Sequence, residues 1–120
     1  MASQEALKLS EKINKEKTKV LAKKLDNYSP EEMRMIADSI RADAKDSIVV
    51  LYQDTNGKIN YLILVGENLI NAHPAHKLVK EISKIIGGGG GGKDYMAEGG
   101  SGNPAKINEA IEYLESKLIK

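Results

Sequence analysis

Apolar side chains recur at helical spacing in four stretches of the chain, and continuous apolar runs separate some of these stretches. The first stretch, residues 4–26, is rich in Lys, Glu, Leu and Ala and lacks Gly and Pro, so it predicts a helix. No apolar residue occurs between 14 and 19, which argues against a sustained coiled coil. A second helix is predicted from Ser29-Pro30, because serine is a favoured cap and proline suits the first helical position.

The runs between the helices predict strands. Residues 47–52 are β-branched and apolar on both faces, which favours a central position in a sheet. Residues 54–58 contain Asn56-Gly57, a hairpin signal, and residues 59–65 are the predicted return strand. Residues 95–98 predict a third strand.

Two further helices complete the pattern, over residues 73–86 and from Asn103-Pro104 to the end of the chain. The predicted order is α-α-β-β-α-loop-β-α. The fold class is therefore α/β (α+β), with a small sheet of at least three strands covered by helices and preceded by an N-terminal helical arm. We expect residues 1–28 to form the arm and residues 29–120 to form a globular domain.

Composition narrows the classes of function. The chain has 120 residues and no cysteine, so disulfides and thiolate metal sites are excluded. No apolar run is long enough to span a membrane, and we expect a cytoplasmic protein without a membrane partner. The net charge is only +1, but residues 1–27 carry seven lysines against four acids.

Six consecutive glycines, Gly87–Gly92, precede Lys93 and allow three interpretations. The spacing satisfies the P-loop pattern, but Asp94 stands where that motif needs Ser or Thr, and the run follows a helix instead of a strand. A flexible linker is the second interpretation, although only 28 residues follow. We favour an ordered tight loop whose exposed N–H groups suit an anion, and we expect Gly90 to need a positive φ.

The residues around this run carry a family resemblance. Residues 78–86 lead into the glycines, and Lys93 and Met96-Ala97-Glu98-Gly99-Gly100 follow. This arrangement resembles the C-terminal, DHH-associated domain (C-Ala) of alanyl-tRNA synthetases over roughly residues 29–118. The family commonly has Pro-Asp where this chain has Asp94-Tyr95, A-G where it has Ala75-His76, and a third glycine at the position of Ser101.

The resemblance implies a non-catalytic module that contacts the elbow of tRNA(Ala) and couples aminoacylation with editing. It also implies upstream aminoacylation and editing domains, to which ATP and zinc would belong, and homodimerisation in some members. No cofactor is expected in this chain. Two alternatives stay open: a dimerisation domain built on helix 4–26 and a sheet edge, and the nucleic-acid-gripping module of a DHH-type phosphoesterase.

Lysines offer two candidate RNA-binding surfaces. Lys8, Lys12, Lys15, Lys19 and Lys23 would share one stripe of the first predicted helix, either along RNA or as a solvated face. The second surface joins one face of helix 73–86 to the glycine run, with four cations and exposed amides expected at one end. Its expected nucleic-acid-binding residues are Lys77, Lys80, Lys84, Gly88, Gly89, Gly90, Gly91, Gly92, Lys93 and Tyr95.

The sequence offers no candidate catalytic residues. The chain has two histidines, His73 and His76, which lie three apart at a predicted helix start. A family zinc site would need further His and Cys ligands, so we expect neither metal ligation nor catalysis.

Overall fold

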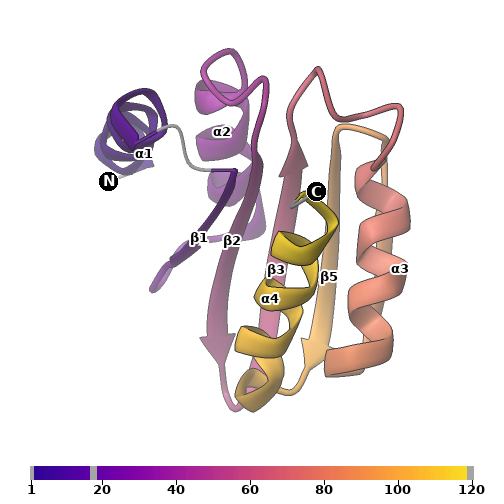
Figure 1. Ribbon diagram of the computed structural model, residues 1–120. Helices are drawn as coiled ribbons and strands as arrows, with labels where there is room; N and C mark the ends of the chain where they lie inside the picture. Colours follow the sequence, from indigo (N-terminus) through magenta and orange to yellow (C-terminus); the bar gives the residue numbers. More distant parts are fainter. Residues whose placement is uncertain (1, 17–18, 119–120) are drawn as a thin grey trace.

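The computed structural model describes residues 2–16 and 19–118. In these residues a five-stranded sheet of order β1-β2-β3-β5-β4 is covered on both faces by helices. Helices α1 and α2 lie on one face, and α3 and α4 lie on the other (Figure 1). The predicted class, a small sheet covered by helices with a helix at the N-terminus, is confirmed.

The N-terminal stretch forms a helix and then a strand. Helix α1 covers Ala2–Glu16, and β1 covers Val20–Lys24, so the prediction of one helix over residues 4–26 is wrong. Strand β1 pairs in parallel with β2, where Val20 lies opposite Ile48. Val20 joins the core under α3 and α4, whereas Leu21 joins the core under α1 and α2. This burial on both faces favours a strand over a helix with one apolar face.

The predicted lysine stripe is therefore broken. Lys8 and Lys12 are exposed on α1, but Lys23 lies in β1 and Lys19 precedes it. Lys15 lies in α1, and its side chain is outside the described part of the structure. The division of the chain into domains at residue 28 stays a prediction.

Helix α2, Pro30–Ile40, begins as the sequence predicts. The Glu32 amide donates to Ser29 Oγ at 3.1 Å, and the Ser29 amide donates to the Glu32 carboxylate at 2.8 Å. This reciprocal capping box satisfies two amides at the helix start. Its buried side chains, Met33, Ile36, Ala37 and Ile40, pack against the sheet.

The central hairpin is also confirmed. Strands β2, Ile48–Thr55, and β3, Lys58–Val65, pair antiparallel, and β2 is central between β1 and β3. Asn56 and Gly57 adopt φ of 53° and 80°, as the turn requires. The Gly57 amide donates to Asp54 Oδ1 at 3.0 Å.

The glycine run forms a strand instead of the predicted loop. Helix α3, Ala75–Ile86, is followed by β4, Gly89–Gly92, which pairs antiparallel with β5, Met96–Gly102. The glycines carry no side chains that could predict a strand, and their pairing with β5 determines their conformation. Tyr95 therefore lies in the turn before the strand that was expected to begin with it.

The chain ends in a short 3-10 turn, Pro104–Lys106, labelled η1, and in α4, Ile107–Leu118. The predicted cap is confirmed, because the Ala105 amide donates to the Asn103 side chain at 3.0 Å. Leu114 is fully buried, and Ile107, Ile111 and Leu118 pack against the same core. None of the described helices is long and apolar enough to cross a membrane.

Candidate nucleic-acid interface

The glycine strand, Gly89–Gly92, forms one edge of the sheet, and all four residues are exposed. A Cβ on Gly90 would lie 2.0 Å from the Glu98 carbonyl oxygen, and one on Gly92 would lie 2.6 Å from Ala97 Cα. Hence these two glycines are needed where β4 approaches β5. A Cβ on Gly89 or Gly91 would meet open space. The edge therefore presents bare peptide groups to solvent.

The physical reasons for glycine differ along the run. Gly87 and Gly88 leave α3 with φ of 85° and 75°, a conformation that favours glycine, and the Gly87 amide donates to the Ser83 carbonyl at 2.9 Å. Gly90 is not among the residues with positive φ, so the expected reason for glycine there is wrong. Close approach to Glu98 is the reason instead.

The turn between β4 and β5 caps the start of α3. The Ala75 amide donates to the Asp94 carbonyl at 2.7 Å, and the His76 amide donates to the Lys93 carbonyl at 3.2 Å. Pro74 has no side-chain acceptor that could serve as the cap. Two amides that an anion would otherwise use at this helix start are thus occupied.

This capping places the predicted cations differently from the expectation. Lys77, Lys80 and Lys84 are exposed along α3, and Lys93 is exposed at the beginning of the turn that caps the helix start. Lys84 lies seven residues after Lys77, which corresponds to roughly 10 Å along a helix. The four cations therefore extend along α3, and their expected convergence at one end is wrong because β4 runs back along the helix.

Tyr95 lies close to two cations in the turn just before β5. Its half-buried ring packs against the core under α1 and α2. The Arg41 guanidinium carbon lies 3.8 Å from the ring centroid, and Lys93 Nζ lies 5.8 Å from it. Both distances allow a cation–π interaction. Sequence reasoning missed Arg41, since nothing local to it indicates contact with a residue 54 positions later.

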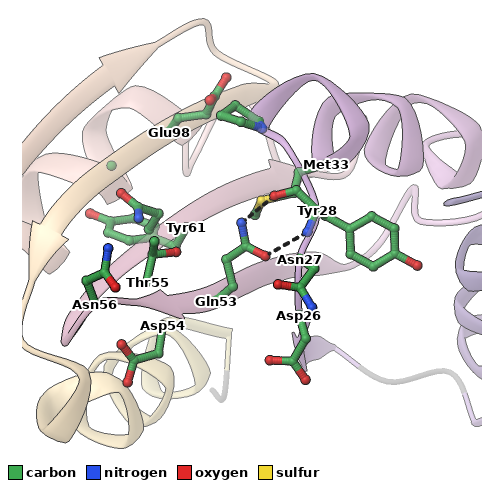
Figure 2. A pocket seen from close by; sticks show the side chains of 13 residues that line it. Asp26, Asn27, Tyr28, Met33, Gln53, Asp54, Thr55, Asn56, Tyr61 and Glu98 are labelled. Carbon is green, nitrogen blue, oxygen red and sulfur yellow. Dashed lines mark hydrogen bonds between the residues drawn. The ribbon is translucent and has the colours of Figure 1, made fainter. Parts of the chain in front are cut away.

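A hollow lies at the other end of the sheet, beside the β2–β3 turn (Figure 2). Its volume is about 810 Å³, and Asp26, Asp54 and Glu98 are among its lining residues. Gln53 is 8% exposed and holds the loop before α2, because its side chain accepts from the Tyr28 amide and donates to the Tyr28 carbonyl. Asp26 and Asp54 disfavour an RNA phosphate in this hollow, whereas the Glu98 carboxylate is paired with the Arg34 guanidinium.

Of the two histidines, only His76 lies in the first turn of α3 as the sequence predicts, and His73 lies in the connection before the helix. His76 is exposed, and the His73 amide donates to the Leu69 carbonyl at 2.8 Å. Within residues 2–16 and 19–118, no group of three or more His, Cys, Asp or Glu side chains is placed to hold a metal ion.

Comparison with known proteins gives this arrangement a context. Residues 17–120 match the family model of the DHHA1 domain. The chain is 39% identical over 98 residues to an alanine–tRNA ligase of Carboxydothermus hydrogenoformans, covering 82% of this chain and 11% of the ligase. It is 34% identical over 116 residues to the ligase of Halalkalibacterium halodurans, covering 95% of this chain and 13% of that protein.

Two solved structures share the fold. The C-Ala domain of Aquifex aeolicus alanyl-tRNA synthetase superposes with a TM-score of 0.75 at 31% identity, covering 82% of this chain and 89% of that one. RecJ of Thermus thermophilus, solved in complex with Mn²⁺, superposes with a TM-score of 0.61 at 18% identity, covering 96% of this chain and 16% of RecJ.

The sheet is covered on both faces and has a glycine strand at one edge, which is the fold of a known class. The chain belongs to the DHHA1 domain family. Within that family it is similar to the C-Ala domain of alanyl-tRNA synthetases, and it spans about 11% of the curated ligases first matched.

Proposed function

We propose that this chain is a non-catalytic tRNA-binding module of an alanine–tRNA ligase. The observation that carries the proposal is the exposed glycine strand beside α3, whose lysines Lys77, Lys80 and Lys84 are also exposed. Cationic side chains next to bare peptide groups suit a phosphate backbone, which is read by charge and shape. The similarity to the C-Ala domain supports the choice of tRNA as the partner.

The proposal extends to the role of the module in a larger protein. The chain spans only a small part of the ligases that it matches, so adenylate formation and aminoacyl transfer would belong to other domains. Contact with the elbow of tRNA(Ala) would let one bound tRNA serve both the aminoacylation and editing domains. ATP and zinc would be bound in those domains, and none of the residues proposed here serves as a catalyst.

The test compares two quadruple variants in tRNA(Ala) titrations across a salt series. Lys77, Lys80, Lys84 and Lys93 are changed to Ala in one variant, and Lys8, Lys12, Lys15 and Lys19 are changed in the matched control. We expect the first variant to bind more weakly, with a flatter dependence of log affinity on log salt, by somewhat under about one unit for each lost phosphate contact. The control removes the same charge from α1 and the segment after it.

The proposal makes further demands on the unmodified chain. The unmodified chain should bind tRNA(Ala) whatever the anticodon sequence. It should neither form alanyl-adenylate nor deacylate mischarged tRNA. Loss of affinity in the α1 variant alone would move the site to the N-terminal helix. A chain that forms dimers by light scattering and binds no tRNA would favour a dimerisation domain instead.

A further inference from the structure

Three connections meet at one end of the sheet, which we call the loop end. They are residues 41–47 after α2, residues 66–74 before α3, and the turn 93–95 between β4 and β5 (Figure 1). Backbone hydrogen bonds join them: the Gly66 amide donates to Ser47 at 2.8 Å, the Asn68 amide to Lys45 at 3.0 Å, and the Val65 amide to Tyr95 at 2.8 Å. The loop end is thus a connected surface made of separate segments.

Cations from separate segments gather on this surface. Arg41 and Lys45 lie in the connection after α2, and Lys93 lies in the β4–β5 turn. All three are exposed, and four exposed acids, Asp43, Asp46, Glu67 and Asp94, lie in the same connections. The Arg41 guanidinium carbon lies 3.8 Å from the centroid of the Tyr95 ring, so the ring holds the side chain on this surface through a cation–π contact.

Two shallow grooves are lined in part by these cations. One, of about 340 Å³, is lined by Asp38, Arg41, Ala42, Lys45 and Glu67. The other, of about 250 Å³, is lined by Lys93, Tyr95, the Arg34–Glu98 ion pair and the bare backbone of Gly91 and Gly92, among others. Asp38 lines both grooves and marks where they approach each other. An extended chain that follows them would pass Arg41 and Tyr95 and reach the glycine strand.

We propose that Arg41 and Lys45 bind the RNA phosphate backbone, so that the RNA reaches the loop end of the sheet from the glycine strand. The inference rests on the proposed function and adds a cationic surface on the α2 side to the lysines of α3. A planar guanidinium held against an aromatic ring suits a phosphate, because its fork of N–H donors matches two phosphate oxygens. Asp38 and Glu67 keep the phosphate at the cationic rims of the grooves.

The experiment uses the full chain and a tRNA(Ala) transcript, titrated across a salt series. Arg41→Gln with Lys45→Gln is compared with Lys24→Gln and Lys58→Gln, a matched pair that removes the same charge from the opposite end of the sheet. We expect the first pair to lose affinity several-fold and the slope of log affinity against log salt to flatten by about 1.4 to 1.8 units. The control pair should leave the slope unchanged.

The outcomes separate the inference from the function on which it rests. Unaltered binding by the Arg41 and Lys45 variant, with tight binding by the wild type, overturns the inference alone. A wild-type chain that does not bind tRNA(Ala) overturns the proposed function as well. Should the double variant melt early, Lys45→Gln alone keeps the Arg41–Tyr95 contact, and the inference then requires its slope to flatten by somewhat under about one unit.

Discussion

Neighbouring glycines of β4 face different surroundings although they share one strand. Gly90 lies against the backbone of β5, whereas Gly91 lies beside open space. Composition cannot distinguish the two, since both belong to a uniform run, and only the pairing with β5 separates them. The chain therefore offers two glycines, adjacent in sequence, on which the same substitution has different consequences.

We expect Gly90→Ala to destabilise the fold and Gly91→Ala to leave it nearly unchanged. A methyl group at residue 90 would overlap the Glu98 carbonyl, and the shift it forces would cost roughly 2 kcal/mol, as overpacking commonly does. At residue 91 the change should stay within about 0.5 kcal/mol. Urea unfolding of both variants measures the difference, and equal midpoints would contradict the close approach of β4 to β5.

A second residue-scale contact joins α3 to α4. Lys117 Nζ lies 3.1 Å from Glu81 Oε1 and 5.3 Å from the Tyr113 ring centroid, and both partners of the pair are about three-quarters buried. Burial acts to raise the pKa of Glu81, but Lys117 and Tyr113 together outweigh it, so the pKa is lowered. The hydrogen bond to Glu81 raises the pKa of Lys117 despite some burial.

The lowered pKa of Glu81 fixes the sign of a pH effect. Its charged form adds stability above the pKa of an unfolded glutamate, about 4.3, and this contribution is lost as pH falls through the lowered pKa of the folded state. We therefore expect Glu81→Gln to reduce the melting temperature at neutral pH and the deficit to shrink in acid. Glu115→Gln on the exposed side of α4 removes the same charge from the same helix and is the matched control.

At the scale of elements, the sequence predicts those whose own side chains carry a pattern. The capping box of α2, the Asn56-Gly57 turn and the Asn103 cap are all local signals, and the structure confirms each. β1 was missed because Val20-Leu21-Ala22 is too short to distinguish a strand from the continuation of a lysine-rich helix. β4 was missed because glycines provide no alternation of polar and apolar side chains.

The residues of the candidate site, too, were predictable only where a local pattern places them. The lysines of α3 could be placed on one helix by their spacing, whereas the location of Lys93 at the helix start depends on β4 running back along α3. The contact of Arg41 with Tyr95 joins two segments that are distant in sequence, a helix end and a turn, and no local pattern predicts it. Long-range pairing therefore determines what the sequence could not predict.

At the scale of the whole molecule, β1 makes the N-terminal segment part of the sheet. Val20, Leu21 and Leu25 are all at most 8% exposed, and Leu25 donates its amide to the Tyr52 carbonyl at 2.7 Å. Removing this segment would turn β2 into an edge strand and uncover apolar side chains such as Ile48 and Val49.

We expect a chain that starts at residue 29 to be much less stable than one that starts at residue 19, because only the latter retains β1. The longer fragment loses α1 and its contacts with α2 but keeps all five strands. Solubility and cooperative thermal melting distinguish the two fragments. A stable, cooperative fragment 29–120 would support the division of the chain into an arm and a separate domain.

The backbone cap on α3 has a consequence for how this surface can evolve. Carbonyl groups at positions 93 and 94 hold the helix start, and every amino acid supplies a carbonyl. The side chains there can consequently be exchanged without removing the cap, which leaves them available for selection on what the surface recognises. Asp94 illustrates this freedom, because its contribution to the helix start comes from its carbonyl, a group that mutation does not remove.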